Sequence, residues 1–99
     1  MPLVGTSLNA VTTTGPGSAV MFDVPRSPIG MLVLTTGSPD EFSCELEVSQ
    51  DGVNWVGVAN TNGGLFANTT FPALFARANL LSFGGGSSPT FTAVISAKG

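Results

Sequence analysis

The side chains that could do chemistry in this chain are few, and most of them are carboxylates. Asp40 and Glu41 are neighbours in the sequence, whereas Glu45 and Glu47 are two residues apart and therefore share one face of an extended strand. Paired carboxylates can act in acid–base catalysis or bind a divalent cation. The chain has no histidine, the commonest general base and metal ligand. We therefore interpret these carboxylates as a solvated strand face, and we predict no catalytic residue, no metal site, no cofactor and no enzymatic activity.

Three further features could carry chemistry. The run Gly84–Gly86 lacks the Lys and the Ser or Thr that follow a phosphate-binding loop. Cys44 is the only cysteine, so an intrachain disulfide is impossible, and its position among alternating apolar residues predicts a small core side chain. An exposed Trp55 could stack on a sugar ring, whereas a buried one would cover the end of a hairpin. Because the chain has no Tyr to extend an aromatic platform, we favour a buried Trp55 packed against Leu46 and Ile95.

The composition limits the partners. Charged residues make up 9% of the chain, against roughly 25% in an ordinary domain, which favours a surface that a partner partly covers. The three basic residues, Arg26, Arg77 and Lys98, are too few to neutralise a run of phosphates, so we expect no nucleic-acid partner. No apolar stretch approaches the ~18 residues of a membrane span. Met1 is not followed by a secretory leader, so we expect synthesis in a host cytoplasm.

Short segments with alternating apolar and polar residues predict an all-β fold. Asp51-Gly52 is a strong hairpin signal, because Gly accepts positive φ without a steric penalty. No window has a helical period. About seven short strands at this spacing predict a single antiparallel β-sandwich, either jelly-roll or immunoglobulin-like. The expected strands are residues 20–24, 29–36, 42–48, 54–59, 65–70, 74–81 and 91–97.

The first part of the chain has a different composition. Residues 1–17 are rich in Thr, Gly, Pro and Ser and have no clear period, so we predict an extended N-terminal arm followed by a sandwich domain over residues 18–99. The arm is expected to attach the protein to a neighbouring surface. The alternative is that it folds back as an edge strand of its own sandwich. Its candidate contact residues are Leu3, Val4, Leu8 and Val11.

The segment Ile29–Leu34 is apolar on both phases of the strand alternation. Such a run is typical of a central strand, or of a strand whose outer face meets another molecule. We therefore add Met31 and Val33 to the candidate contact residues and expect a homo-oligomer, with a trimer favoured.

Three segments carry a resemblance to a known class of proteins. Ser49-Gln-Asp-Gly-Val-Asn-Trp55, Ala76-Arg-Ala-Asn-Leu80 and Gly84-Gly-Gly-Ser-Ser-Pro-Thr-Phe-Thr-Ala93 resemble small all-β virion structural proteins of tailed bacteriophages. In those proteins an S-x-D-G-x-x-W hairpin is followed by an A-R-A-x-L strand, a Gly-Gly loop and a P-x-x-T-A strand. The similarity covers residues 42–97 and leaves out the arm. Phe75 stands where such proteins would have a Tyr, so a buried hydroxyl contact is not expected here.

The resemblance implies a capsid decoration or cement protein. Such proteins bind the outer surface of the head shell, bridge subunits of the major capsid protein and are often trimers. The protein would then be found in the virion, on the capsid surface. Two alternatives stay open: a minor tail or head-fibre protein, and a carbohydrate-binding or adhesion module.

Overall fold

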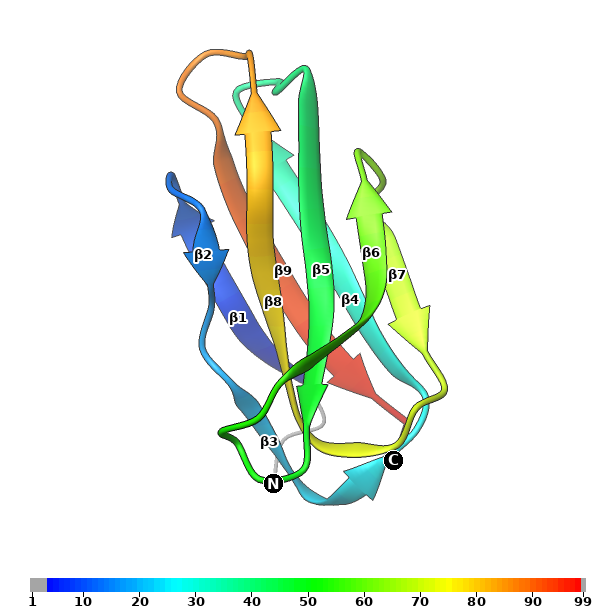
Figure 1. The fold of residues 1–99 in the computed structure, drawn as a ribbon. Coiled ribbons are helices and arrows are strands. Elements are labelled where there is room, and N and C mark those ends of the chain that lie inside the picture. Colours follow the sequence, from blue (N-terminus) through cyan, green and yellow to red (C-terminus); the bar gives the residue numbers. More distant parts are fainter. Residues whose placement is uncertain (1–3, 99) are drawn as a thin grey trace.

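The computed structural model describes residues 4–98, which form two antiparallel β-sheets packed face to face as a sandwich (Figure 1). The four-stranded sheet has the order β1-β9-β4-β7. The five-stranded sheet has the order β2-β8-β5-β6, and its fifth strand, β3, also pairs with β8. The strands are β1 Val4–Val11, β2 Gly15–Pro16, β3 Val20–Arg26, β4 Ile29–Thr36, β5 Glu41–Ser49, β6 Val56–Asn62, β7 Phe66–Thr69, β8 Ala73–Gly84 and β9 Thr90–Ala97.

The all-β sandwich predicted from the sequence is confirmed, and each of the seven expected strands is present. They correspond to β3 through β9, and the segment 29–36 has the expected bounds. The main difference is the number of strands, which is nine among the described residues because the segment predicted as an arm contributes β1 and β2. Within residues 4–98 no helix has the length and hydropathy needed to cross a bilayer.

The core lies between the sheets and follows the two-residue period of the strands. In β4 the odd-numbered apolar residues are buried, in β5 the even-numbered ones are, and in the middle of β8 Ala76, Ala78 and Leu80 are. Phe91 is central, because its ring contacts Phe42 at 5.4 Å and Phe83 at 4.9 Å between centroids. The largest fully buried side chains are Phe22, Phe91, Ile29, Met31, Leu46, Leu80, Ile95, Val33, Val48 and Cys44.

The predicted N-terminal arm is part of the sandwich. Residues 4–11 pair with β9 along an edge of the four-stranded sheet, and residues 15–16 pair with β8 in the other sheet. The edge-strand alternative is therefore what the structure shows for these residues. The alternation in β1 is interrupted by register shifts after Thr6 and after Leu8, which is why the sequence has no clear period there.

One serine ties this edge strand to the opposite sheet. The Ser7 Oγ accepts a hydrogen bond from the Ala78 amide at 2.8 Å and donates one to the Ser18 carbonyl at 2.7 Å. The Ser7 carbonyl in turn accepts a hydrogen bond from the Ser18 amide. The Ala78 amide lies between the stretches of β8 that pair with β2 and with β3, so the Ser7 hydroxyl fills a gap in the sheet ladder. Gly17 permits this close passage, because a Cβ there would overlap the Ser7 carbonyl.

Candidate interaction surfaces

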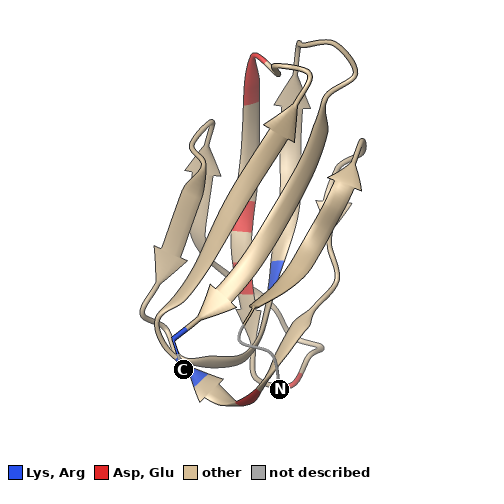
Figure 2. Ribbon diagram, turned by 180° about the vertical axis from the view of Figure 1, so that it is seen from behind, with Lys and Arg blue, Asp and Glu red and all other residues tan. Residues whose placement is uncertain are grey.

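The two sheets differ sharply in charge. None of the three basic and six acidic residues of the chain lies on β1, β4, β7 or β9, so the four-stranded sheet is uncharged. Six of the nine lie on β3, β5 and β8 of the five-stranded sheet, and Figure 2 shows the acidic segments of β5 behind the uncoloured strands of the other sheet. The remaining three are Asp40, Asp51 and Lys98, in turns or just after β9. Most of the few charged residues of the chain therefore lie on one of the two sheets.

The outer face of the four-stranded sheet, which we call the neutral face, exposes apolar side chains. Leu32 and Leu34 point outward from β4, and Leu34 is 50% exposed. Leu32 is paired with Phe66 of β7, whose ring lies over Gly30. Val4, which is 58% exposed, extends this face onto the edge strand β1. The neighbouring outward positions on β1 and β9 carry small uncharged residues, among them Thr6, Thr92, Val94 and Ser96.

The structure separates the contact residues predicted from the sequence. Leu8, Met31 and Val33 are buried in the core, so their side chains are not available to a partner. Val11 is partly buried against the core, and Leu3 lies outside the described residues. Val4 is exposed on the neutral face. In the run 29–34 the outward side chains are therefore Leu32 and Leu34, and not the predicted contact residues Met31 and Val33.

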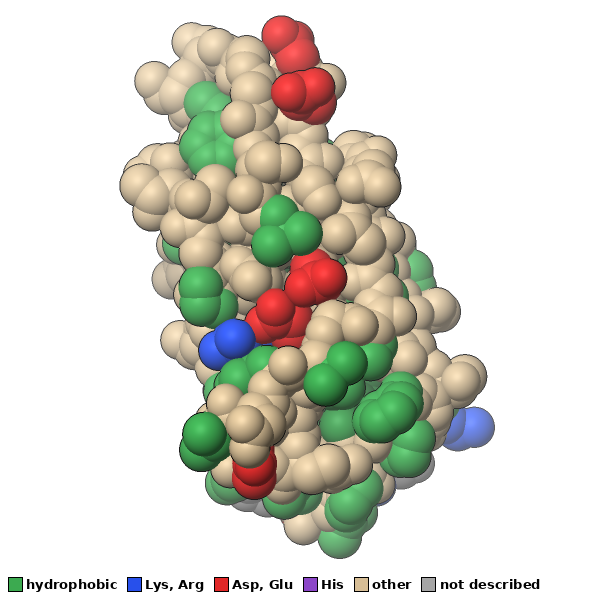
Figure 3. Space-filling view, in the orientation of Figure 1, with side chains coloured by type: hydrophobic (Ala, Val, Ile, Leu, Met, Phe, Trp, Pro, Cys, Tyr) green, Lys and Arg blue, Asp and Glu red, His purple; other side chains and the backbone are tan. Residues whose placement is uncertain are grey.

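A second apolar surface lies at the end of the sandwich where β1 begins and β9 ends, and we call it the apolar end. Figure 3 shows hydrophobic side chains gathered over the lower half of the molecule in that view. An apolar depression of about 220 Å³ lies here between the start of β6 and the loop before β8. Val48, Val56 and Phe71 provide its apolar walls. The exposed apolar residues of this end are Met21, Val24, Val53, Val56 and Phe71.

The loop beside this depression is held by a single carboxylate. Asp51 accepts hydrogen bonds from the backbone amides of Asn54 and Val53, both at 2.8 Å, and from the Asn54 side chain at 2.7 Å. These donors, with the Ser49 hydroxyl, hold the pKa of Asp51 well below its usual range. Gly52 adopts φ +76°, which the turn requires. The loop therefore presents Val53, 77% exposed, from a pre-organised backbone.

The outer face of the five-stranded sheet carries a row of polar side chains. Arg77 donates to Glu47 at 2.6 Å, and the Asn79 amide donates to the other carboxylate oxygen at 3.1 Å. Burial alone would raise the pKa of Glu47, but the hydrogen bonds from Arg77 and Asn79 outweigh it and lower that pKa. Burial and the adjacent Glu47 carboxylate raise the pKa of Glu45, which lies over Gly57.

This glutamate pair has separated pKa values, as an acid–base pair would, but its geometry is that of a structural ion pair. Glu47 is held by Arg77 and Asn79, and neither Glu45 nor Glu47 lines the depressions of about 610, 220 and 290 Å³ on the described surface. Within residues 4–98 no group of three or more potential metal ligands lies close together.

The prediction of a buried Trp55 was wrong. Its half-buried indole lies on the outer face of the five-stranded sheet, where the Arg77 guanidinium stacks at 4.2 Å from the ring centroid. The cause is a bulge in β6, since Leu46 pairs with Ala59 but Glu47 pairs with Gly57. One extra residue reverses the side on which every preceding side chain lies. An uninterrupted strand would have turned Trp55 inward.

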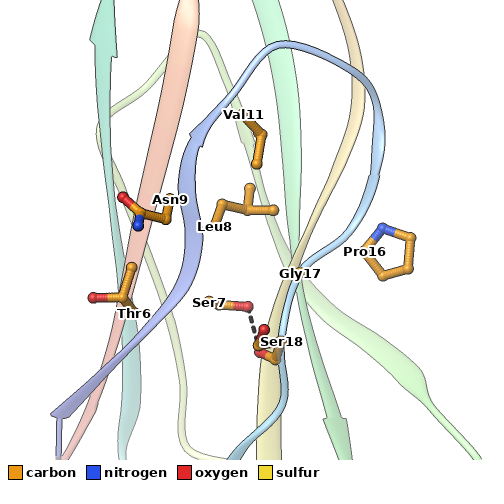
Figure 4. Close-up of a pocket in the computed structure, with 8 residues that line it drawn as sticks. All are labelled: Thr6, Ser7, Leu8, Asn9, Val11, Pro16, Gly17 and Ser18. Carbon is orange, nitrogen blue, oxygen red and sulfur yellow. Dashed lines mark hydrogen bonds between the residues drawn. The ribbon is translucent and has the colours of Figure 1, made fainter.

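A depression of about 610 Å³ lies between β1 and β2, where edges of the two sheets separate (Figure 4). It is an open cleft whose eight lining residues are all uncharged. Figure 4 shows the Ser7 hydroxyl directed at Ser18 across its floor. None of the eight lining residues is a carboxylate, His, Lys or Cys, so none of them can act as a general base for the hydroxyls of Thr6, Ser7 and Ser18.

Comparisons with known proteins bear on the fold. Searches of protein-family models and of curated proteins found no match. The fold is similar to the crystal structure of the SPBc2 prophage-derived protein YomS, with a TM-score of 0.68. The alignment covers 96% of this chain and 91% of that chain at 10% sequence identity. At this identity the likeness establishes a shared sandwich fold.

Proposed function

We propose that the chain is a structural protein of a phage virion, and specifically a decoration protein that binds the outer surface of the head shell and stabilises it. The observation that carries this proposal is the apolar end, where exposed side chains surround a depression beside a pre-organised loop. Two further observations support it: the resemblance of residues 42–97 to phage virion proteins, and the fold shared with a prophage-derived protein. In this proposal the chain is not an enzyme.

The elongated shape supports an upright orientation on the shell. The molecule measures 40 × 21 × 20 Å, and none of its exposed large hydrophobic residues lies in the turns 37–40 and 85–89 at the far end from the apolar end. Figure 3 shows acidic side chains at that far tip. The apolar end would contact the major capsid protein, and the polar tip would face solvent. Each half-exposed apolar side chain that the shell covers contributes about 1 kcal/mol.

The test is binding to heads of the phage that encodes the chain, measured as the amount of protein that co-sediments with the particles. Phe71→Ser is expected to weaken binding about tenfold or more, because it removes the largest exposed apolar group of this end. Leu81→Ser is the matched control, since Leu81 is 44% exposed on β8 and outside the apolar end. Equal binding by Phe71→Ser and the control would overturn the proposed contact.

Mass spectrometry of purified virions distinguishes the head from the tail. A copy number that follows that of the major capsid protein supports decoration of the shell. A copy number that follows the tail proteins instead would favour the minor tail or head-fibre alternative.

The position of Trp55 favours a second candidate, a carbohydrate-binding module. The indole lies outside the core against Arg77, and Arg77 is bonded to Glu47, so an aromatic surface and planar polar groups lie close together. Arg77 already covers one ring face, so a sugar would have to stack on the other. A glycan array tests this candidate: signals that disappear in Trp55→Ala, with an unchanged fold, would support it, and an array without signals would remove it.

A further inference from the structure

The neutral face has two properties that are unusual together on an exposed sheet. None of its four strands carries a charged residue, and among the described residues the one charged side chain at its border is Lys98, just after β9, beside Phe66 and Ser96. The face exposes Val4, Leu32, Leu34 and Phe66. Leu32 joins three of the strands, since it is paired with Phe66 of β7 on one side and with Val94 of β9 on the other. Exposed apolar surface of this extent on a soluble domain marks an interface.

We propose that the neutral face binds the same face of a second copy of the chain. The charge distribution identifies this occupant. The chain has a net charge of −3, so two copies repel one another wherever their carboxylates come close. The five-stranded sheet would bring Glu45 and Glu47 of both copies together, whereas the neutral face brings none of the carboxylates together.

The distances make this difference decisive. Packed sheets lie ~10 Å apart, so pairing through the neutral faces separates the two charged sheets by roughly 30 Å. The screening length at physiological ionic strength is ~8 Å. Repulsion between the charged sheets is therefore almost fully screened in this arrangement. The contact is also self-complementary, as a twofold axis requires, because each copy contributes the same leucines and the same small residues.

The small area of the contact limits the affinity of the two copies for each other. Four strands of these lengths present a footprint of roughly 450 Å² per copy, given the spacing of residues and strands in a sheet. A standard stable interface buries ~800 Å² per partner. The pair is therefore weak in free solution and becomes extensive only at high protein concentration, or where neighbouring copies are held on a common surface. A twofold pair differs from the trimer expected from the sequence, since a flat face that meets itself closes after two copies.

The test uses the full chain without particles, so its outcome does not depend on the proposed function. Sedimentation velocity from micromolar concentrations to roughly 1 mM is expected to show a reversible monomer–dimer equilibrium. Leu34→Glu places a carboxylate on each neutral face and is expected to raise the dissociation constant more than about tenfold. Leu81→Glu is the matched control, because it adds the same charge at a similarly exposed leucine on the other sheet, 44% against 50% exposed.

Two variants of opposite charge distinguish a lost contact from a folding defect. Leu34→Glu and Leu34→Lys are each expected to stay monomeric, whereas an equimolar mixture is expected to form heterodimers, since opposite charges then face each other. Thermal unfolding of each variant confirms that it is folded. Three results would overturn the proposal: a wild-type chain that is monomeric at roughly 1 mM, a Leu34→Glu variant that associates like the wild type, or a Leu81→Glu variant that loses association equally.

Discussion

Replacing Ser7 by Ala tests whether the N-terminal strand is an integral part of the fold. The Ser7 side chain is nearly buried, at 5% exposure, and its hydroxyl lies 2.8 Å from the Ala78 amide and 2.7 Å from the Ser18 carbonyl. Alanine keeps the backbone pairing of β1 and removes only the oxygen. The buried Ala78 amide would then have no acceptor, because neither β2 nor β3 pairs with β8 at that residue.

The size of the effect follows from this amide. A buried donor without a partner costs about 1–3 kcal/mol. The Ser18 carbonyl adds little, because Ser18 is exposed and water can replace the lost donor. We therefore expect Ser7→Ala to lower the free energy of unfolding by about 2 kcal/mol. For a domain of this size that loss corresponds to a fall in Tm of roughly 8–16 °C.

Thermal and urea unfolding, followed by circular dichroism and by Trp55 fluorescence, measure this loss. Ser43→Ala is the control, because the Ser43 hydroxyl donates to Asn60 at 3.1 Å on the exposed side of β5 and its loss leaves no buried group unpaired. The control is expected to change the stability by less than about 0.5 kcal/mol. The reasoning is refuted if Ser7→Ala is as stable as the control, because the hydroxyl would then not be the partner that the Ala78 amide needs.

Five more outcomes are expected. Deleting residues 2–14 should leave the chain unfolded by circular dichroism, since it removes β1 and opens the core. The Cys44 thiol should resist a thiol reagent until the protein unfolds, because burial raises its pKa to about 11 and closes access. In a carboxyl NMR titration Glu45 should titrate at higher pH than Glu47, and Glu47→Gln should lower the Glu45 midpoint by removing a neighbouring charge. Because its folded-state pKa is lowered, Glu47 should add stability above its unfolded pKa and lose it as pH falls through the folded value, so Glu47→Gln should differ most from wild type near neutral pH. Trp55→Ala should cost about 1 kcal/mol rather than the 3–5 kcal/mol of a core cavity, since the indole packs on the outer face.

Each of these expectations has a result that contradicts it. A truncated chain with cooperative unfolding would show that β1 is dispensable. Rapid labelling of Cys44 in the native protein would mean that the sheets separate readily. Equal midpoints for Glu45 and Glu47 would show that the two carboxyls do not interact. A Glu47→Gln variant whose stability relative to wild type did not depend on pH would show that the ionised Glu47 adds no stability. A loss of several kcal/mol in Trp55→Ala would place the indole in the core.

The sequence predicted most of the sandwich because strand alternation and turn residues are local signals. The segments that became β5 and β9 alternate over most of their length, and Asp51-Gly52 marks the hairpin between β5 and β6. β1 has no such signal. Its partners in β9 are 80 to 92 residues away, from the pair Val11 and Phe91 to the pair Val4 and Ser96, and its bulges break the period. Its place in the sheet is determined by contacts that a local pattern does not contain.

For two segments the local sequence pattern also could not show which side chains face the core. In the run 29–34 both phases are apolar, so alternation cannot tell which side faces the core, and the structure turns Met31 and Val33 inward. Trp55 has the opposite problem. The segment that contains it does alternate, but the bulge between Gly57 and Ala59, which pair with Glu47 and Leu46, reverses the side on which Trp55 lies. A bulge inserts one residue without a composition signal of its own.

The distribution of charge combines local and non-local information, and it explains the low charge of the chain better than a general preference for neutral residues does. A chain that merely favoured Thr over Lys and Glu would place its few charged residues on both sheets. Here the expected strands 29–36, 65–70 and 91–97 already lack charge in the sequence, and pairing gathers them, with β1, into one sheet. If the distribution were due to chance, all three basic and all six acidic residues would have to lie outside β1, β4, β7 and β9 by coincidence. Selection for a covered face requires only that charges stay off that face, because a buried unpaired charge is costly. The Leu34→Glu and Leu81→Glu pair separates these explanations, since a general preference predicts that both added charges are equally harmless, whereas a covered face predicts that only the first disrupts association.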